Sequence, residues 1–350
     1  VWIMAYTTID KPTDYFNTVL YTGNSGSNRG ITGVGFQPDW VWLKTRSKAN
    51  SHILIDSVRG QERLRSNTTG GEVDVSSEFI SFDTDGFTVT ENAANEMNNN
   101  STTYANWNWK AGTSFTNDAS STGIGSIDST GSVSTDAGFS IVTFTGNSGS
   151  IAHGLAQKPA MVIIKPRNVS GSWIVTHKGL GAEMQDYYQF LDTTAAKATS
   201  NDIWGGEPTS TTFSVSSSLI DSANYVAYCF AEKKGYSKFG SYTGNGNADG
   251  TFVYTGFKPA WVMWKRTDAT NDWYIYDNKR NSFNTMGRRL EANRSDDEVN
   301  SGSAIVDFVS NGYKFRGTDP SWNVSGGTFI YMAFAEESFV SSSGVPATAR

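Results

Sequence analysis

The sequence predicts an all-β protein made of three internally repeated β-sandwich or jelly-roll-like units of about 95 residues each. Three observations support this prediction. A motif of fixed spacing occurs three times along the 350 residues. Short β-branched and aromatic runs, bounded by Gly, Asn, Asp and Ser, fill each unit. The sequence has no long stretch in which apolar residues recur with the 3.6-residue period of a helix between capping residues.

Each unit opens with an aromatic-Thr-Gly-Asn turn and then has a proline before an apolar strand. The turns begin at Tyr21, Phe144 and Tyr242, and the strands read PDWVWLK, PAMVIIK and PAWVMWK. Gly and Asn tolerate the left-handed backbone of a tight turn. Proline has no amide hydrogen to donate, so it suits the first position of a strand. A run that is apolar at every position favours a strand buried on both faces.

Three sets of residues follow these prolines at constant distances of six, fourteen and eighteen positions. In chain order they are Lys44, Lys165 and Lys265; His52, Trp173 and Trp273; and Asp56, His177 and Asp277. We interpret the lysines as structural, with the stem on the sheet edge and the ammonium in water. We interpret the eighteenth positions as turn caps, because each lies in a different unit and the three cannot form one catalytic site.

Each unit ends with a turn, a short apolar segment and an aromatic strand. The aromatic strands read YANWNWKAG, YVAYCFAE and FIYMAFAE, and they begin 66, 66 and 70 residues after the prolines. These landmarks predict an N-terminal arm at 1–16, repeats at 17–112, 138–235 and 236–340, and a C-terminal tail at 341–350. The Ser/Thr/Gly-rich residues 113–137 are a linker or a hairpin arm. Segment 181–199 is the best helix candidate.

Composition and motifs exclude several functions. Lys+Arg is 28 and Asp+Glu is 34, a net charge of −6, which disfavours nucleic acid as a partner. The sequence has no uninterrupted run of about 18 apolar residues, so we expect no membrane insertion. The three histidines and Cys229 lack metal-site spacing, and no nucleotide or nucleophile motif occurs. We therefore expect no cofactor and no catalytic residues.

Four loop-flanked tryptophans are the candidates for ligand binding. The apolar face of a sugar ring stacks on Trp or Tyr while neighbouring polar groups bind its hydroxyls. Trp173, Trp204, Trp273 and Trp322 are therefore predicted as glycan-stacking residues. For Trp173 and Trp273 a core position is the favoured interpretation, because a shared place in the repeat usually means shared packing.

Several longer stretches carry a family resemblance. They are MAYTTIDKPTDYFNTVLYTGN, ITGVGFQPDWVWLK, IDSVRG, YCFAEKKGYSKFGSYTGN, YTGFKPAWVMWKRT and YMAFAEESF with SGVPATAR. With these stretches the chain resembles an uncharacterised family of repeat-containing structural proteins of tailed phages from marine and freshwater bacteria. The resemblance implies a tail-fibre or capsid-associated virion protein, and it implies no catalytic residues.

The residues and the resemblance together predict a non-enzymatic structural protein located in the virion. The first hypothesis is a tail-fibre or appendage component that binds a host-surface glycan. The second is a capsid decoration protein, because three units can match a local three-fold environment. The third is a jelly-roll glycan depolymerase, which needs two carboxylates about 5–10 Å apart. Expected partners are other tail or capsid proteins, with the chain oligomeric in the particle. The units stand in a row or close into a pseudo-trimer.

Overall fold

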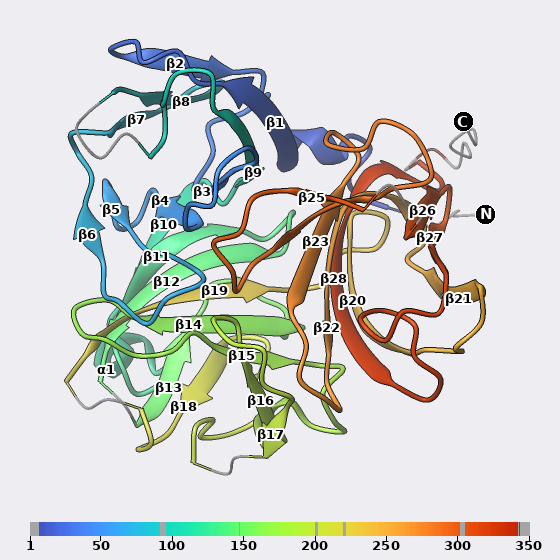
Figure 1. Cartoon of the computed structure of the whole chain (residues 1–350). Helices are drawn as coiled ribbons and strands as arrows, with labels where there is room; N and C mark the ends of the chain where they lie inside the picture. Colours follow the sequence, from blue (N-terminus) through green and yellow to red (C-terminus); the bar gives the residue numbers. More distant parts are fainter. Residues whose placement is uncertain are drawn as a thin grey trace.

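The computed structural model describes residues 7–91, 96–146, 148–199, 202–219, 222–301, 305–341 and 343 (Figure 1). Its large sheets have four, eight and six strands, and neighbouring strands in them pair in antiparallel fashion. The prediction of an all-β fold is confirmed. Helical structure in the described ranges consists of short turns only: η1 (Pro12–Asp14), α1 (Ala119–Thr122) and η2 (Met184–Asp186). Residues 1–6 of the predicted arm and most of the predicted tail lie outside these ranges.

The first unit, residues 17–112 by the sequence landmarks, forms a four-stranded sheet with a three-stranded sheet behind it. The large sheet has the order β1-β9-β3-β4 and the small one β2-β8-β7, with a β5–β6 ladder beside them. The strands are β1 (Phe16–Thr22), β2 (Arg29–Thr32), β3 (Trp40–Thr45), β4 (Ile53–Asp56), β5 (Glu62–Arg63), β6 (Val73–Asp74), β7 (Phe79–Asp83), β8 (Gly86–Val89) and β9 (Thr103–Trp109).

The second unit, residues 138–235, contributes six strands to an eight-stranded sheet and two strands to a small sheet. The orders are β12-β19-β14-β15-β16-β17 and β13-β18. The strands are β12 (Phe139–Thr145), β13 (Gly149–Ala152), β14 (Met161–Pro166), β15 (Ile174–His177), β16 (Tyr187–Phe190), β17 (Ala198–Thr199), β18 (Thr212–Val215) and β19 (Asn224–Phe230).

The third unit, residues 236–340, has a six-stranded sheet and a small three-stranded sheet. The orders are β20-β28-β22-β23-β24-β25 and β21-β27-β26. The strands are β20 (Ser237–Thr243), β21 (Asp249–Tyr254), β22 (Phe257–Arg266), β23 (Trp273–Asp277), β24 (Arg288–Glu291), β25 (Val299–Asn300), β26 (Val306–Val309), β27 (Gly312–Arg316) and β28 (Thr328–Ser338).

The same strand order occurs in the three large sheets. In each, the closing aromatic strand lies between the opening strand and the strand that follows the proline, and the next strand of the chain pairs on the far side of that one. The orders are β1-β9-β3-β4, β12-β19-β14-β15 and β20-β28-β22-β23. The closing strand therefore lies inside its sheet. Trp107 of β9, for example, is opposite Thr18 of β1 on one side and Trp42 of β3 on the other.

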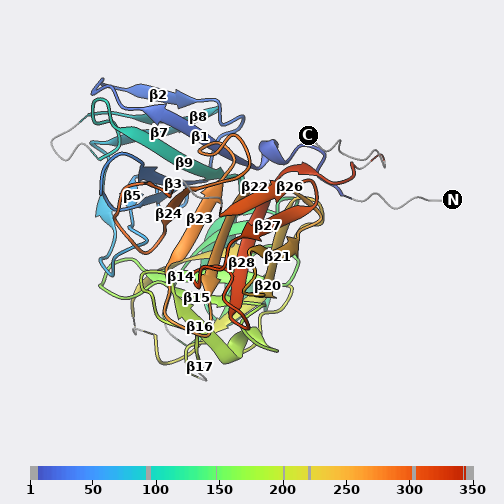
Figure 2. The ribbon, with the colours of Figure 1, turned by 45° about the vertical axis from the view of Figure 1, so that its right-hand side comes forward.

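Both faces of each large sheet are buried, and this explains the continuous apolar runs. One face packs against the small sheet of the same unit. The other faces the centre of the molecule, where the three large sheets meet (Figure 2). In β3, Trp40 and Trp42 lie in the central core, while Val41 and Leu43 lie under the small sheet. Alternate residues of one strand thus belong to two different cores.

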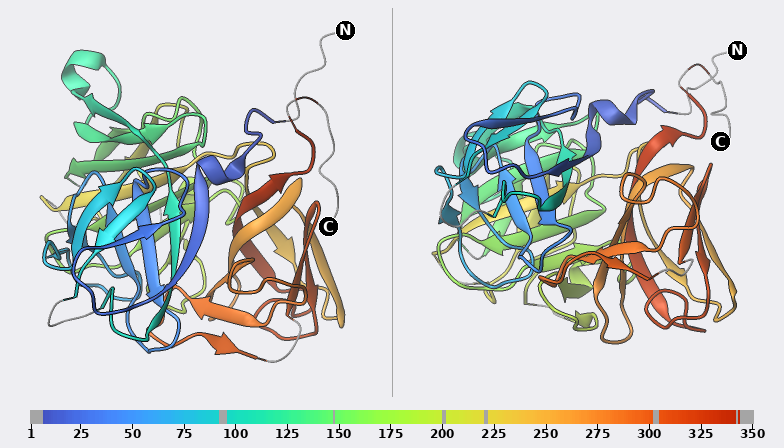
Figure 3. Two further views of the ribbon diagram at one scale, coloured as in Figure 1. Left: turned by 90° about the horizontal axis from the view of Figure 1, so that it is seen from above. Right: turned by 45° about the horizontal axis from the view of Figure 1, so that its top comes forward.

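The Ser/Thr/Gly-rich residues between the first and second units fold as a hairpin arm. β10 (Thr113–Asn117) pairs with β11 (Ser129–Ser134), and β11 pairs with β12, so the arm adds two strands to the edge of the second sheet (Figure 3). Asp118 caps α1 at the tip by accepting a hydrogen bond from the Ser121 amide. In the described parts of the other two large sheets, β1 and β20 occupy this edge.

The helix candidate at 181–199 is wrong. This segment contains η2 and the strands β16 and β17. Phe190 is opposite Ile174 of β15, and the pairing continues the large sheet. Aromatic residues with weak helix preference form a strand here because a neighbouring strand edge offers backbone partners.

The three units form a closed ring rather than a row. One backbone hydrogen bond of the same kind joins each pair of units, with the amide in one unit and the carbonyl in the next. The three bonds run from Glu72 to Arg167 (2.6 Å), from Lys197 to Thr267 (2.9 Å) and from Glu298 to Arg46 (2.8 Å). The first unit thus donates to the second, the second to the third, and the third to the first.

Candidate functional site

The four tryptophans predicted to stack on a glycan are buried. Trp173, Trp204, Trp273 and Trp322 expose 0%, 4%, 1% and 6% of their surface. Trp173 and Trp273 lie in the central core, and the other two lie in the cores within the second and third units. A ring without a free face cannot stack on a sugar. The prediction is therefore corrected: ring closure covers Trp173 and Trp273, packing within their own units covers Trp204 and Trp322, and all four are packing residues.

The residues fourteen positions after the prolines join neighbouring units. Trp173 Nε1 donates to the Arg65 carbonyl of the first unit (2.8 Å), and Trp273 Nε1 donates to the Phe190 carbonyl of the second (2.9 Å). In the first unit the same place is taken by a histidine, which contacts the third unit. Each of these rings therefore satisfies one carbonyl across an interface.

The histidine of this set, His52, is held in one neutral form. Its Nδ1 accepts a hydrogen bond from Trp42 Nε1 (2.8 Å), so the proton lies on Nε2, which donates to the Glu291 carbonyl (2.9 Å). Burial, and then the positive charge of Lys44, hold the pKa of His52 well below its usual value. His52 is a structural residue and is not available for proton transfer.

Asp56 and Asp277, eighteen positions after their prolines, build two matching buried networks. Asp56 Oδ2 accepts hydrogen bonds from Arg59 Nε (2.6 Å) and from the hydroxyl of Tyr228 in the second unit (2.7 Å). Asp277 Oδ2 does the same with Arg280 Nε (2.5 Å) and with Trp107 Nε1 of the first unit (3.0 Å). Their Oδ1 atoms cap the following turns, as expected from the sequence: Asp56 accepts from the Val58 and Arg59 amides, and Asp277 from the Lys279 and Arg280 amides. The carboxylates thus cap turns and also close interfaces.

His177 occupies this place in the second unit and uses different chemistry. Its Nδ1 accepts a hydrogen bond from the Gly179 amide (2.9 Å), so Nε2 carries the proton and donates to the Tyr331 carbonyl of the third unit (3.0 Å). Burial lowers the pKa of His177 to about 3. The imidazole is therefore neutral in the folded protein across the physiological range.

The three repeated lysines are structural, but their ammonium groups are not in water as the sequence suggested. All three are fully buried. Burial lowers the pKa of Lys44 and Lys165 to about 8 and that of Lys265 to about 7. The bonds across interfaces run from Lys165 to the Thr69 carbonyl (2.9 Å) and from Lys265 to the Thr194 carbonyl (2.9 Å). Lys165 and Lys265 therefore connect units, whereas Lys44 donates to the Thr45 and Lys48 carbonyls of its own unit.

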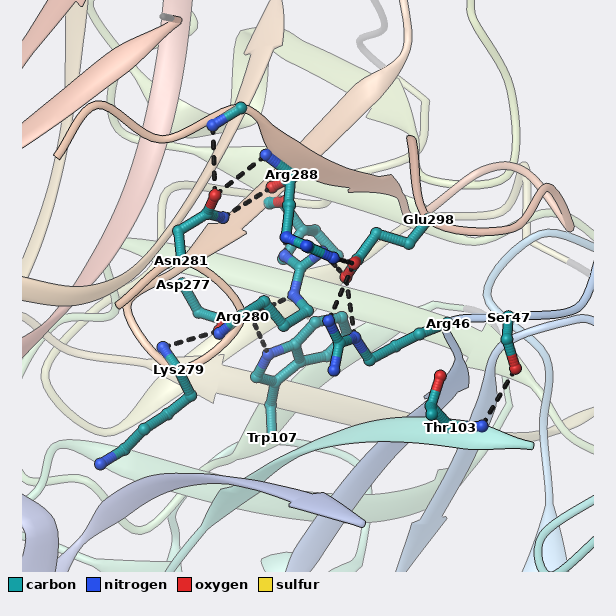
Figure 4. A network of polar contacts seen from close by, with 12 residues as sticks. Arg46, Ser47, Thr103, Trp107, Asp277, Lys279, Arg280, Asn281, Arg288 and Glu298 are labelled. Atoms are coloured by element: carbon teal, nitrogen blue, oxygen red, sulfur yellow. Dashed lines mark hydrogen bonds and ion pairs between the residues drawn. The ribbon is translucent and has the colours of Figure 1, made fainter. Parts of the chain in front are cut away.

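The interface between the third and first units contains the densest charge network. Figure 4 shows Arg46, Arg280 and Arg288 converging on Glu298, with N–O distances of 2.9, 3.3 and 2.9 Å. Burial raises the pKa of Glu298, but the guanidinium groups outweigh it and the net shift is downward. The carboxylate is fully engaged in joining Arg46 of the first unit to the third unit.

Cys229 and the acidic turns also have structural roles. Cys229 is buried in β19, and burial raises the pKa of its thiol far above the usual value. Asp85 accepts hydrogen bonds from the Gly33 and Gly35 amides, which lower its pKa. Among the described residues, no three His, Cys, Asp or Glu side chains are placed to hold a metal ion.

Two aromatic side chains on the same strand face water, on the outside of the third unit. Phe252 and Tyr254 belong to β21, an edge strand of the sheet β21-β27-β26, and they expose 45% and 54% of their surface. Residues two apart on a strand point to the same face, about 6.8 Å from each other. Val253, between them, is buried in the core. Phe252 and Tyr254 therefore form an aromatic strip on this face.

Polar groups and a glycine frame the aromatic strip. Gly312 of β27 is opposite Tyr254, and a Cβ on it would meet the Val253 carbonyl oxygen at 2.1 Å and the Phe252 ring at 3.0 Å. Glycine thus leaves room for the β21 backbone and for the Phe252 ring. Lys314, opposite Phe252, forms an ion pair with Asp249 (2.6 Å) and lowers its pKa. The arrangement offers an apolar face beside paired charges of both signs, which suits a sugar ring.

The other two units lack this strip. Val253 is opposite Tyr313, as Ile31 is opposite Phe87 in the first unit and Ile151 is opposite Phe213 in the second. The residues that flank these buried positions are Gly30 and Thr32 in the first unit and Ser150 and Ala152 in the second. The fold therefore does not require rings here. The sequence signal for the strip was a departure from the repeat, whereas the predicted tryptophans were chosen because loops flank them.

Comparison with known proteins identifies the family and nothing about activity. Residues 11–338 match the family described as a domain of unknown function, DUF7483. The chain belongs to this family. No curated protein and no solved structure matches the chain. No helix within the described ranges is long and apolar enough to cross a membrane.

Proposed function

We propose that the chain is a non-enzymatic structural protein of a phage virion, part of a tail fibre or another appendage, that binds a host-surface glycan through the aromatic strip. The observation that carries the glycan proposal is the exposure of Phe252 and Tyr254 on one face of β21. The virion location rests on the sequence resemblance. The ring of three units serves as the scaffold of the strip. Its buried side chains His52, Asp56, His177 and Asp277 are engaged in structural contacts.

The binding proposal is tested with the double variant Phe252→Ala, Tyr254→Ala. We expect at least tenfold weaker binding to isolated host-surface polysaccharide, measured by calorimetry, and fewer adsorbed particles. The matched control is Phe283→Ala, which removes a ring that is 85% exposed on the loop between β23 and β24. Unchanged binding by the double variant, or an equal loss in the control, contradicts the strip as the site.

Capsid decoration is the second candidate function, and the closed ring of three units supports it. A ring of three similar sheets can sit on a local three-fold position of a capsid lattice. Cryo-electron microscopy of the intact particle separates the two candidates. Copies throughout the head lattice support decoration, whereas a few copies at the tail support the appendage.

The depolymerase alternative has less support at the strip. Its neighbouring acids Asp249 and Asp307 are ion-paired with Lys314 and Arg316. A glycosidase needs one carboxyl group whose raised pKa keeps it protonated, and the pKa of Asp249 is lowered. New reducing ends released from host polysaccharide by the purified chain contradict the non-enzymatic proposal.

A further inference from the structure

The hairpin arm creates a concave surface that is separate from the aromatic strip. An open pocket of about 730 Å³ lies beside β11, β12 and the tip of the arm. A second pocket of about 370 Å³ lies between the arm and the corner of the first unit. Thr116 and Thr130 line both pockets. The two pockets are therefore adjacent, and we call them together the arm trough.

The floor of the arm trough is a row of side-chain hydroxyls and amides on the sheet. Thr130 and Thr143 share a hydrogen bond between their Oγ1 atoms (2.8 Å), and Thr145 Oγ1 donates to Asn224 Oδ1 (2.8 Å). By strand alternation this is the face that carries Ile141 in the central core. The trough lies where this face continues past the core. Hydroxyls both donate and accept hydrogen bonds, as sugar hydroxyls do.

The walls of the arm trough carry carboxylates held in place by the backbone. Asp118 accepts from the Ser121 amide (3.0 Å), and Asp128 accepts from the Ala119 amide (2.8 Å). At the far end Asp39 accepts from the Ala111 amide (2.8 Å). Arg167 lies opposite and is paired with Glu72. The walls are thus fixed before any ligand arrives, which lowers the entropy cost of binding.

Charge and size define the ligand class. Three aspartates and one arginine line the arm trough, so the lining is net acidic and repels an anionic chain. The larger pocket falls within the range of about 300–1,000 Å³ of ligand sites. We propose that the arm trough binds a saccharide chain that is neutral or bears amino groups. This rests on the proposed function for the glycan class, but it uses none of the strip's residues.

The test uses one strand and both of its faces. Thr116→Trp fills the arm trough, whereas Thr113→Trp places the same ring on the opposite face of β10; both threonines are exposed. The probes are maltohexaose, a hexamer of glucosamine and a hexamer of galacturonate, titrated by calorimetry. We expect the neutral or the amino hexamer to bind, a loss of at least tenfold in Thr116→Trp, and none in Thr113→Trp.

Several results overturn the proposal. They are no binding of the neutral and amino hexamers, preference for galacturonate, or equal affinity in wild type and Thr116→Trp. Asn224→Ala, a truncation on the floor, is a second variant in case Thr116→Trp unfolds, and it also should weaken binding. The variant Phe252→Ala, Tyr254→Ala separates the two proposals. If it binds the hexamers like wild type, the trough stands whether or not the strip proposal holds.

Discussion

The second unit has an interface with the first unit and another with the third. The two interfaces differ at the residue eighteen positions after the proline. Toward the first unit, a buried Asp56–Arg59 pair meets the Tyr228 hydroxyl. Toward the third unit, a neutral His177 donates to the Tyr331 backbone carbonyl, and the residue in the place of Arg59 is Leu180. At this position one interface is therefore ionic and the other is uncharged.

The residue on the facing strand explains the difference. Tyr228 and Trp107 each bring a hydrogen-bond donor into the core, and each meets an aspartate. The corresponding residue of β28 is Met332, which has no donor, and here the aspartate is replaced by histidine. A buried carboxylate needs charge and donors around it, so the partner across the interface decides which side chain can occupy this position.

Breaking a buried ionic network should give the largest effect. Asp277→Ala, in the matching network between the third and first units, removes the nearer of the two carboxylates paired with Arg280, whose side chain is fully buried. We expect the free energy of unfolding to fall by about 3–5 kcal/mol, measured by urea denaturation. Adding Arg280→Leu, the residue found in the second unit, should recover part of this loss. A loss below about 1 kcal/mol in the single variant contradicts the role given to Asp277.

Acid should weaken the uncharged interface next. The folded pKa of His177, about 3, lies below the unfolded value of 6.5, so its contribution is complete above pH 6.5 and is lost as the pH falls toward 3. By pH 4 this amounts to about 3 kcal/mol. His153, with a pKa lowered to about 4 by burial, acts in the same direction. Urea unfolding at pH 7, 6, 5 and 4 tests this, and His177→Gln should give a shallower dependence; equal slopes contradict it.

Exchanging the chemistry of the two interfaces tests the comparison directly. His177→Asp places a carboxylate opposite Met332 and should cost about 2–3 kcal/mol. The triple variant His177→Asp, Leu180→Arg, Met332→Tyr copies the ionic interface and should recover at least half of the loss. Thermal unfolding of both variants measures the interaction free energy among positions 177, 180 and 332. No recovery would mean that the facing residue does not decide the chemistry.

The smallest effect is expected at the position fourteen residues after the proline, where the second and third units both have tryptophan. Trp273→Phe removes the hydrogen bond to the Phe190 carbonyl and leaves that carbonyl buried, which should cost about 1–2 kcal/mol. Trp173→Phe should cost the same, because it loses the equivalent bond to Arg65. Both are measured by urea denaturation at pH 7. A clear difference between them shows that the two interfaces also differ at this position.

The fold class was predictable because it depends on local patterns. Turn residues, β-branched runs and the proline before each apolar strand act within a few positions of the chain. The apolar run at β3 correctly indicated a strand buried on both faces. The helix candidate at 181–199 failed because β15 supplied a pairing partner that no local rule contains.

The candidate site was not predictable in the same way. Trp173 and Phe252 are both large aromatic residues in the printed sequence, yet one is fully buried and the other is 45% exposed. Which side of a strand meets a second sheet depends on residues more than a hundred positions away. The buried ammonium of Lys165 follows the same rule, since its carbonyl partner Thr69 belongs to another unit.

The sequence by itself determined the β-rich class and the positions that recur with fixed spacing. Tertiary structure alone decided that the units close into a ring, because closure depends on contacts such as Glu72 with Arg167 and Glu298 with Arg46. Ring closure then buried Trp173 and Trp273 and left Phe252 and Tyr254 in water. Burial is a property of both surfaces that meet, and a single stretch of chain specifies only one of them.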